Sequence, residues 1–313
     1  MSDNIKTNSL RAWLLAARPK TLAGAAVPVI IGTAFAIKDT GMEGFQWIPA
    51  LLCVLFAFIM QIDANFINDY FDFKRGNDDR ATRLGPKRAC AEGWIKPSAM
   101  LSGIILTTTI ACIVGLPLVL WGGLDLILIG LICVVFCFLY TTTLSYYGLG
   151  DLLVLLFFGV IPVCLTYYLE LPTMIHAITW EVFFASLACG MVVDTLLIVN
   201  NYRDRDNDLR DHKMTLVVRL GAKKSEKLYL ALGMGAFLIM VVIYFYHFLT
   251  TPDKGISFIS MALLLIYLVL HRNAQKKMKA INQGRQLNQI LGLTARNMFI
   301  YDILCALGIV ILM

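Results

Sequence analysis

Long apolar runs alternate with short polar segments along the whole chain. A helix needs about 20 mostly apolar residues to cross the hydrocarbon core of a membrane. Because runs of this kind recur nine times, the pattern predicts nine transmembrane helices. Their expected ranges are 21–37, 47–70, 99–121, 124–144, 149–170, 178–201, 227–249, 255–271 and 292–312.

The composition excludes an ordinary soluble protein. Of the 313 residues, 58% are hydrophobic and 15% are charged, whereas a soluble domain is about 45–50% apolar and about 25% charged. Disorder is excluded because the chain has ample apolar surface to bury. The first 20 residues include Asp3 and lack an adjoining apolar stretch, so we expect no cleavable signal peptide. We therefore predict a single all-α integral membrane domain over residues 1–313, a bundle of nine transmembrane helices.

The basic residues indicate how the spans are oriented. Of the 27 Lys and Arg residues, 24 fall in four polar segments that each follow an even number of spans. Basic residues favour the cytoplasmic side of a membrane. The pattern therefore predicts a multi-pass protein with residues 1–20 in the cytoplasm and the C-terminus outside. The four basic segments are 1–20, 70–98, 201–227 and 272–291.

Two similar acidic motifs follow the second and the sixth span. Both contain the pattern Asn-(Asp/Asn)-Tyr-x-Asp, at 68–72 and at 200–204, a separation of 132 residues. A repeat of this kind is typical of a bundle built from two related halves. With their flanking polar residues, the motifs extend over 65–79 and 200–211.

Helical spacing places the polar side chains of each motif on one face. At about 100° per residue, positions i, i+4, i+7 and i+11 fall on one face, and so do positions i, i+4, i+8 and i+11. Polar groups inside apolar helices are costly and usually functional, whereas the ordinary charge of cytoplasmic loops does not explain two matching rows. The first row comprises Gln61, Asn65, Asn68 and Asp72, and the second comprises Asn200, Asp204, Asp208 and Asp211.

These rows indicate a site for a magnesium-bound diphosphate. Facing carboxylates repel each other unless a cation lies between them, and hard oxygen ligands favour Mg²⁺. The eight Cys residues show neither C-x-x-C spacing nor a nearby His, so we expect no Cys-based metal site. Surrounding Lys and Arg side chains would bind the rest of the diphosphate charge. The net charge of +6 does not gather on a soluble module, and we expect no nucleic-acid partner.

The motifs resemble the UbiA superfamily of membrane prenyltransferases, which carries an N-D-x-x-D-type motif after its second helix and D-x-x-x-D after its sixth. Here Asn68-Asp69-Tyr-Phe-Asp72 and the pair Asp204 and Asp208 match these motifs. In one departure, Gly76 stands where relatives have an acid, and Asp78 follows two residues later. Further stretches resemble the menaquinone-pathway branch, the 1,4-dihydroxy-2-naphthoate polyprenyltransferases: Arg18-Pro-Lys-Thr-Leu22, Leu84-Gly-Pro-Lys-Arg88, Gly148-Leu-Gly-Asp151 and Thr215-Leu-Val-Val-Arg-Leu-Gly221.

The resemblance implies Mg²⁺-dependent transfer of a polyprenyl group from polyprenyl diphosphate to 1,4-dihydroxy-2-naphthoate, with loss of CO₂ and diphosphate, giving demethylmenaquinone. It also implies a bacterial cytoplasmic (inner) membrane. One alternative stays in the superfamily with another acceptor, such as 4-hydroxybenzoate, homogentisate or haem. A second is a membrane transporter or an ion channel. A transporter would carry its binding groups near the bilayer midplane, whereas here they lie at the ends of spans.

The resemblance also implies roles for individual residues. The expected metal ligands are Asn68, Asp72, Asp78, Asp204 and Asp208. The expected diphosphate contacts are Lys87, Arg88, Arg18, Lys20 and Lys213. The expected catalytic residues are Asp72, Asp204, Tyr70, Tyr140 and Asp151.

The aromatic and amide side chains have more specific expected roles. One of Tyr70 and Tyr140 should face the allylic cation, which an aromatic ring stabilises. Asp151 would orient a hydroxyl group of the acceptor or pair with a basic residue, and Asp63 and Asp194 either pair structurally or line the cavity. The residues expected to line the acceptor cavity are Gln61, Asn65 and Asn200.

Overall fold

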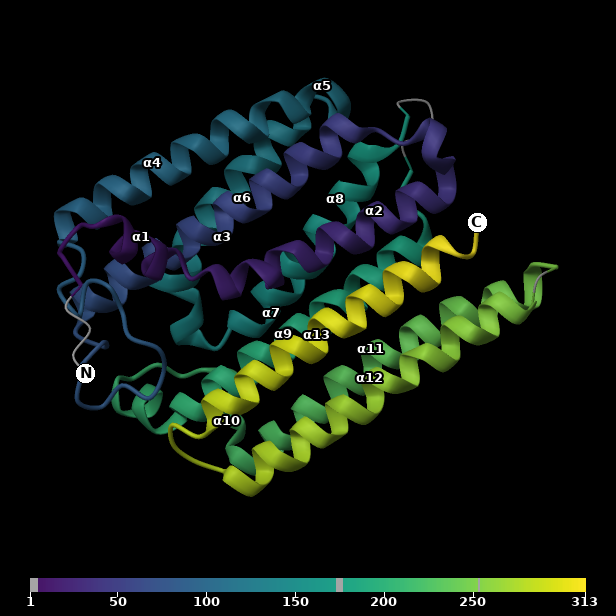
Figure 1. Ribbon diagram of the computed structural model, residues 1–313. Coiled ribbons are helices and arrows are strands. Elements are labelled where there is room, and N and C mark those ends of the chain that lie inside the picture. Colours follow the sequence, from purple (N-terminus) through teal and green to yellow (C-terminus); the bar gives the residue numbers. More distant parts are fainter. Residues whose placement is uncertain (1–4, 173–176, 253) are drawn as a thin grey trace.

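The protein is a helical bundle. The computed structural model describes residues 5–172, 177–252 and 254–313, which form helices and turns without a strand (Figure 1). Within these residues, nine helical stretches are long and apolar enough to cross a membrane, which confirms the predicted number. The α-helices are α1 (Leu10–Ala17), α2 (Leu22–Gly44), α3 (Trp47–Arg75), α4 (Pro97–Gly115), α5 (Val119–Gly122), α6 (Asp125–Thr142), α7 (Gly150–Leu155), α8 (Ile161–Glu170), α9 (Trp180–Arg210), α10 (Leu216–Leu220), α11 (Ala222–Thr250), α12 (Lys254–Ile281) and α13 (Leu287–Val310).

Helix α9 lies at the centre of the bundle. It packs against α2, α7, α8, α11 and α13, and it is the most buried of the spans. Helices α3, α4 and α6 form the other flank, where α6 is the least buried span (Figure 1). The side chains of α9 therefore face protein on nearly every side, which explains why its polar residues need partners.

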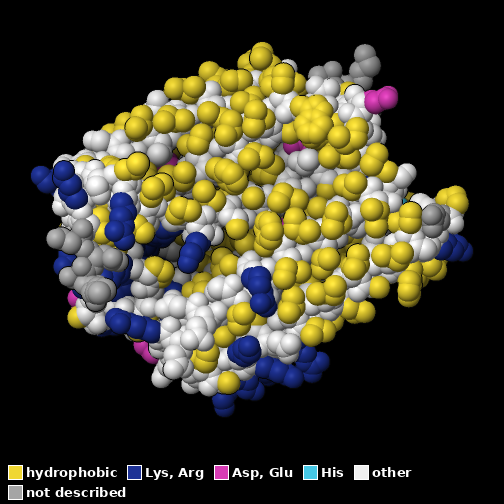
Figure 2. All heavy atoms as spheres, in the orientation of Figure 1, with side chains coloured by type: hydrophobic (Ala, Val, Ile, Leu, Met, Phe, Trp, Pro, Cys, Tyr) yellow, Lys and Arg dark blue, Asp and Glu magenta, His cyan; other side chains and the backbone are white. Residues whose placement is uncertain are grey.

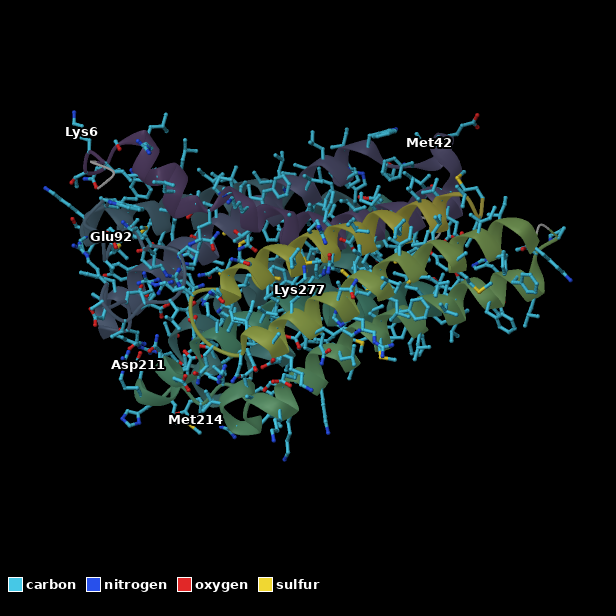
Figure 3. The ribbon with its side chains drawn as sticks, turned by 60° about the horizontal axis from the view of Figure 1, so that its bottom comes forward. Lys6, Met42, Glu92, Asp211, Met214 and Lys277 are labelled. Carbon is cyan, nitrogen blue, oxygen red and sulfur yellow. The ribbon has the colours of Figure 1, made fainter. Side chains whose placement is uncertain are left out.

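Lys and Arg side chains gather at one end of the molecule, which we call the basic end. Figure 2 shows them around the loop 76–96 and α10, while hydrophobic side chains cover the middle of the bundle. Lys6, Glu92, Asp211 and Met214 lie at the basic end, whereas Met42 lies at the opposite end (Figure 3). This separation has the form expected of a protein with one basic membrane face.

Both motif-bearing helices end at the basic end. Helix α3 stops at Gly76, which adopts a left-handed φ of 79° and donates its amide to Asp72 O and Phe73 O. Helix α9 continues to Arg210, so the second motif is helical over residues 200–210. We expected Asp211 to extend the second row, but it is the C-cap residue of α9.

Glycine contacts bring α7 and α9 unusually close together. A Cβ atom on Gly159, in the π-helical segment Leu156–Val160 (η4), would lie 2.6 Å from the carbonyl oxygen of Ser186. A Cβ atom on Gly190 would lie 2.8 Å from the carbonyl oxygen of Leu155. Only glycine permits this backbone contact, which also brings the side chains near α7 close to those of α9.

Candidate active site

The two acidic rows meet around the ammonium group of Lys213, in the turn after α9. Its Nζ lies 3.7 Å from Asp208 Oδ1, and its charge also interacts with that of Asp72 on α3. Burial acts to lower the pKa of Lys213, but the charges of Asp208 and Asp72 raise it above the usual range. Lys213 thus supplies a cation of the kind that facing carboxylates require.

The loop 76–96 carries two arginines onto the first row. Arg88 Nη2 lies 3.3 Å from Asp72 Oδ2, and Arg88 Nε lies 3.7 Å from Asp78 Oδ2. Arg83 pairs with the other oxygen of Asp78. Burial raises the pKa of Asp78 to about 7, although the charge of Arg83 opposes this rise. Arg83 is not predicted from the sequence, because nothing in its spacing distinguishes it from the other cations of the loop.

Asp69 and Asn65 position this part of the site. Asp69 accepts hydrogen bonds of 2.8 Å from the amides of Ala89 and Cys90, and so fixes the loop against α3. Asn65 donates to Ala17 O at 3.0 Å and to Thr21 Oγ1 at 2.9 Å. We expected Asn65 to line the acceptor cavity, but its amide is engaged in joining α3 to the end of α1.

Arg18 turns inward between α1 and α2. It adopts a left-handed φ of 50°. Its Nη1 lies 3.5 Å from Asn65 Oδ1, and its Nη2 lies 3.8 Å from Asp69 Oδ2. Lys20, only two residues later, is exposed. Of these two expected diphosphate contacts, the structure therefore brings Arg18 to the first row.

On the second row, Arg203 holds Asp204. Its Nε and Nη2 lie 2.8 Å and 2.5 Å from the two carboxylate oxygens. The same guanidinium donates to Asn200 Oδ1 and to Asn288 Oδ1 on α13, both at 2.8 Å. Asn200 is therefore engaged with Arg203, although we expected it to line the cavity. Arg203 is only 3% exposed, and its burial, which is not visible in the sequence, is what marks it as a site residue.

Several buried atoms at the basic end have no hydrogen-bond partner. They include the Oδ2 atoms of Asp78 and Asp208 together with Arg18 Nη2 and Arg88 Nη1. Carboxylate oxygens without a hydrogen bond fit a bound cation, and guanidinium nitrogens without one fit a bound anion. Within the described ranges, no three His, Cys, Asp or Glu side chains are close enough to hold a metal ion by themselves. Oxygen atoms from Asn68 and from a diphosphate would therefore have to complete the coordination of Mg²⁺.

The two candidate tyrosines lie in different surroundings. Tyr140 lines a cavity of about 10 Å³ together with Asp151, Asn201 and Lys213. This volume holds about one water molecule. Tyr70 is 6% exposed and packs in a hydrophobic cluster with Phe66, Ile67 and other residues near the loop 76–96. The structure therefore brings Tyr140, and not Tyr70, to Lys213.

Two further expected residues lie away from these contacts. The side chain of Lys87 is 65% exposed, and its Nζ lies 3.9 Å from Glu92 Oε2. Gln61 is half-buried on α3, one turn further from the basic end than Asn65. The structure does not join either residue to the cluster that contains Asp72, Asp208 and Lys213.

A larger hollow adjoins this cluster at the surface of the basic end. Its volume is about 740 Å³, and its lining includes Arg75, Tyr146, His212 and Arg219. The guanidinium carbon of Arg75 lies 4.4 Å from the ring centre of Tyr146, and Asn77 donates a hydrogen bond to the hydroxyl of that tyrosine. The basic and aromatic lining of this hollow suits an aromatic anion.

Comparisons with known proteins agree with the motifs. The model of the UbiA prenyltransferase family matches residues 25–290. The chain is 34% identical over 242 residues to 1,4-dihydroxy-2-naphthoate octaprenyltransferase of Escherichia coli K12, covering 74% of this chain and 76% of that one. It is 31% identical over 301 residues to the protein of the same description from Mycobacterium tuberculosis H37Rv, covering 95% and 96% of the two chains.

Solved structures share the fold at low sequence identity. A UbiA homologue from Aeropyrum pernix K1 superposes with a TM-score of 0.67 at 13% identity, covering 92% of this chain and 97% of that one. A UbiA homologue from Archaeoglobus fulgidus, bound to DMAPP and Mg²⁺, superposes with a TM-score of 0.60 at 15% identity, covering 94% and 98%. These structural similarities extend over nearly the whole chain, and the family match over residues 25–290 includes both motifs.

Proposed function

The chain belongs to the UbiA prenyltransferase family, and we propose that it transfers a polyprenyl group from polyprenyl diphosphate to 1,4-dihydroxy-2-naphthoate. The products would be CO₂, diphosphate and demethylmenaquinone, formed first as its quinol. One observation carries this proposal: buried carboxylate oxygens and buried guanidinium nitrogens that lack a hydrogen-bond partner occur together at the basic end, where both motif helices end. The descriptions of the bacterial relatives support the naphthoate as acceptor.

The acidic rows would hold a divalent metal ion with the diphosphate. When bound, Mg²⁺ neutralises negative charge on the leaving diphosphate. The residues that would hold it are Asn68, Asp72, Asp78, Asp204 and Asp208. A UbiA homologue that shares this fold is bound to DMAPP and Mg²⁺, which supports this assignment.

Basic side chains would stabilise the leaving group further. As the bond from the allylic carbon to the diphosphate oxygen breaks, negative charge grows on the diphosphate. Arg88 and Lys213 already lie beside carboxylates of the two rows, and Arg18 lies beside Asn65 of the first row and the neighbouring Asp69. They are therefore in place to meet this charge. Donors that are fixed before the reaction stabilise the transition state more than the ground state.

The ring of Tyr140 would face the allylic cation, and the acceptor would lie beside it. The ring carbon that bears the carboxylate attacks the allylic carbon. The bond to the carboxylate then breaks, and its electrons restore the aromatic ring as CO₂ leaves. The present cavity beside Tyr140 holds about one water molecule, so this step needs the cavity to widen when the acceptor enters from the basic hollow.

The acceptor assignment is tested by competition between substrates. Purified protein in detergent, with Mg²⁺ and radiolabelled polyprenyl diphosphate, should prenylate 1,4-dihydroxy-2-naphthoate at least tenfold faster than 4-hydroxybenzoate, because each suits a different pocket shape. Equal rates would contradict the naphthoate assignment but leave a UbiA-type transferase with another acceptor. Transport of diphosphate across vesicles without any prenylated product would instead favour the transporter.

We also propose that the basic end faces the cytoplasm of a bacterial inner membrane. The supporting observation is that loop 76–96, the turn after α9 and α10 lie together at this end. A cysteine introduced at Lys87, in a chain whose exposed Cys112 is replaced by Ser, should react with a membrane-impermeant maleimide only after the cells are opened. Labelling in intact cells would reverse the orientation.

A further inference from the structure

Two buried acids lie on the closely packed helices α7 and α9. Asp151 on α7 is 8% exposed and Asp194 on α9 is 5% exposed. Each has a buried Oδ1 atom without a hydrogen-bond partner. In the part of the chain that the structure describes, no Lys, Arg or His side chain forms an ion pair with either of them.

The glycine contacts between α7 and α9 fix the register of these acids. The two elements run antiparallel, and the close approaches pair Gly159 with Ser186 and Leu155 with Gly190. One helical turn further toward the basic end, the same register pairs Asp151 with Asp194. A negative charge on Asp151 therefore acts on Asp194. Because neither acid forms an ion pair in the described part of the chain, ionising both together would be costly, and one proton shared between them would remove this cost.

Asp63 shows what a purely structural acid looks like in this protein. It lies on α3, 131 residues before Asp194 in the sequence, and it is fully buried. The hydroxyl groups of Thr107 and Thr108 donate to its two oxygens at 2.5 Å and 2.7 Å. Asp63 therefore has hydrogen-bond donors within the fold, whereas Asp151 and Asp194 each have a buried oxygen without a donor.

Of the two acids, Asp151 is the one that lies beside the expected reacting groups. That carboxylate lines the same small cavity as Tyr140 and Lys213, and Lys213 contacts the second acidic row. A hydroxyl group that donates to Asp151 would therefore belong to a ring held between Tyr140 and the diphosphate. Asp194 lies behind Asp151 and acts on the ring only through it.

We propose that Asp151 and Asp194 share one proton and act as a proton reservoir for the acceptor hydroxyl next to the reacting carbon, an inference that rests on the proposed function. As the new C–C bond forms, the hydroxyl proton passes to the pair, the hydroxyl oxygen becomes a carbonyl, and the product is a β-keto acid. When the bond to the carboxylate breaks, its electrons move to that carbonyl oxygen. This oxygen takes the proton back, so the pair ends as it began.

Asp151 is then a catalytic residue and Asp194 a positioning residue. Loss of a general base lowers kcat by about 10²–10⁴-fold. In the full-length protein, Asp151→Asn and Asp194→Asn should each lower kcat by about 10²-fold and leave the Kd for polyprenyl diphosphate within twofold. The double variant should be no slower than the slower single variant, because the two residues act as a unit. Asp63→Asn, the matched control, should keep the wild-type kcat. Wild-type kcat in Asp194→Asn would overturn the pair.

A second measurement separates proton transfer from a structural role. With a halogenated acceptor whose hydroxyl is already ionised at the assay pH, the kcat ratio of wild type to Asp194→Asn should fall from about 10² to within threefold. An unchanged ratio would mean that Asp194 acts structurally, and would overturn the reservoir.

If wild type binds polyprenyl diphosphate but prenylates no naphthoate, the proposed function fails instead. In that case, infrared difference spectra still test the pair: Asp151→Asn and Asp194→Asn should each remove one protonated-carboxyl band that Asp63→Asn retains, and retention of that band in either variant would overturn the shared proton.

Discussion

The two acidic motifs share a sequence pattern, yet their carboxylates are held in different ways. On α3, Asp72 is met by Arg88 from a loop 16 residues away, and the backbone of the same loop holds Asp69. On α9, Asp204 is met by Arg203, its neighbour in the sequence. The two halves therefore share the acids of the repeat but not the source of the cations. The first half takes its cation from a folded loop, while the second takes Arg203 from the same helix and Lys213 from the turn that follows it.

The acids themselves should be the most sensitive point of both halves. Because each row supplies metal ligands, Asp72→Asn and Asp204→Asn should each lower kcat by about 10³-fold or more. The matched control is Asp206→Asn, since Asp206 is exposed on another face of α9, and it should stay within twofold of wild type. Steady-state prenylation rates at saturating Mg²⁺ provide the measurement. A strong loss in only one of the two motif variants would break the equivalence of the halves.

Substitutions of the loop cations should have the next largest effect on activity. Of the neighbours Lys87 and Arg88, only Arg88 should matter. Arg88→Ala removes a charge-assisted contact of the first row and should lower kcat/KM by about 10²-fold. Lys87→Ala should change kcat/KM by less than twofold, because the Lys87 side chain is 65% exposed and faces Glu92. Equal losses in the two variants would show that both side chains turn to the diphosphate when it binds.

A smaller effect on kcat is expected where the loop 76–96 contacts α9. A Cβ atom on Gly85 would lie 2.8 Å from Arg203 Nη2, and Arg203 is fixed by Asp204, Asn200 and Asn288. Gly85→Ala should therefore displace Arg203 and lower kcat by about tenfold. Gly130→Ala on α6, where no atom lies within 4 Å, is the matched control and should keep the wild-type rate. Wild-type activity in Gly85→Ala would mean that the loop shifts and Arg203 keeps its position.

The sequence predicts the bundle and the acidic rows because both depend on local pattern. Apolar run length gives the nine spans, and helical spacing brings Asp72, Asp204 and Asp208 to the basic end. Spacing cannot decide between Lys87 and Arg88, since the backbone course of the loop determines which side chain points inward. It also cannot reveal Arg203, whose importance comes from contacts to α13 and the loop.

The tyrosines and amides also show that sequence spacing does not determine which partner a side chain contacts. Tyr70 and Tyr140 both lie near span ends in the sequence, but only Tyr140 lines the cavity beside Lys213. Asn65 and Asn200 fall on the predicted rows, yet their side chains bind Arg18 and Arg203. Position on a helix face is set by periodicity, whereas the partner that a side chain meets is set by tertiary packing.

The most direct test of the account is whether polyprenyl diphosphate binds through Mg²⁺ and both acidic rows. Isothermal titration of the purified protein with polyprenyl diphosphate should give tight binding with Mg²⁺. In EDTA, and in Asp72→Asn or Asp204→Asn, the affinity should fall by at least about 10²-fold. Equally tight binding in EDTA, or in both variants, would contradict the claim that the two rows hold a magnesium-bound diphosphate.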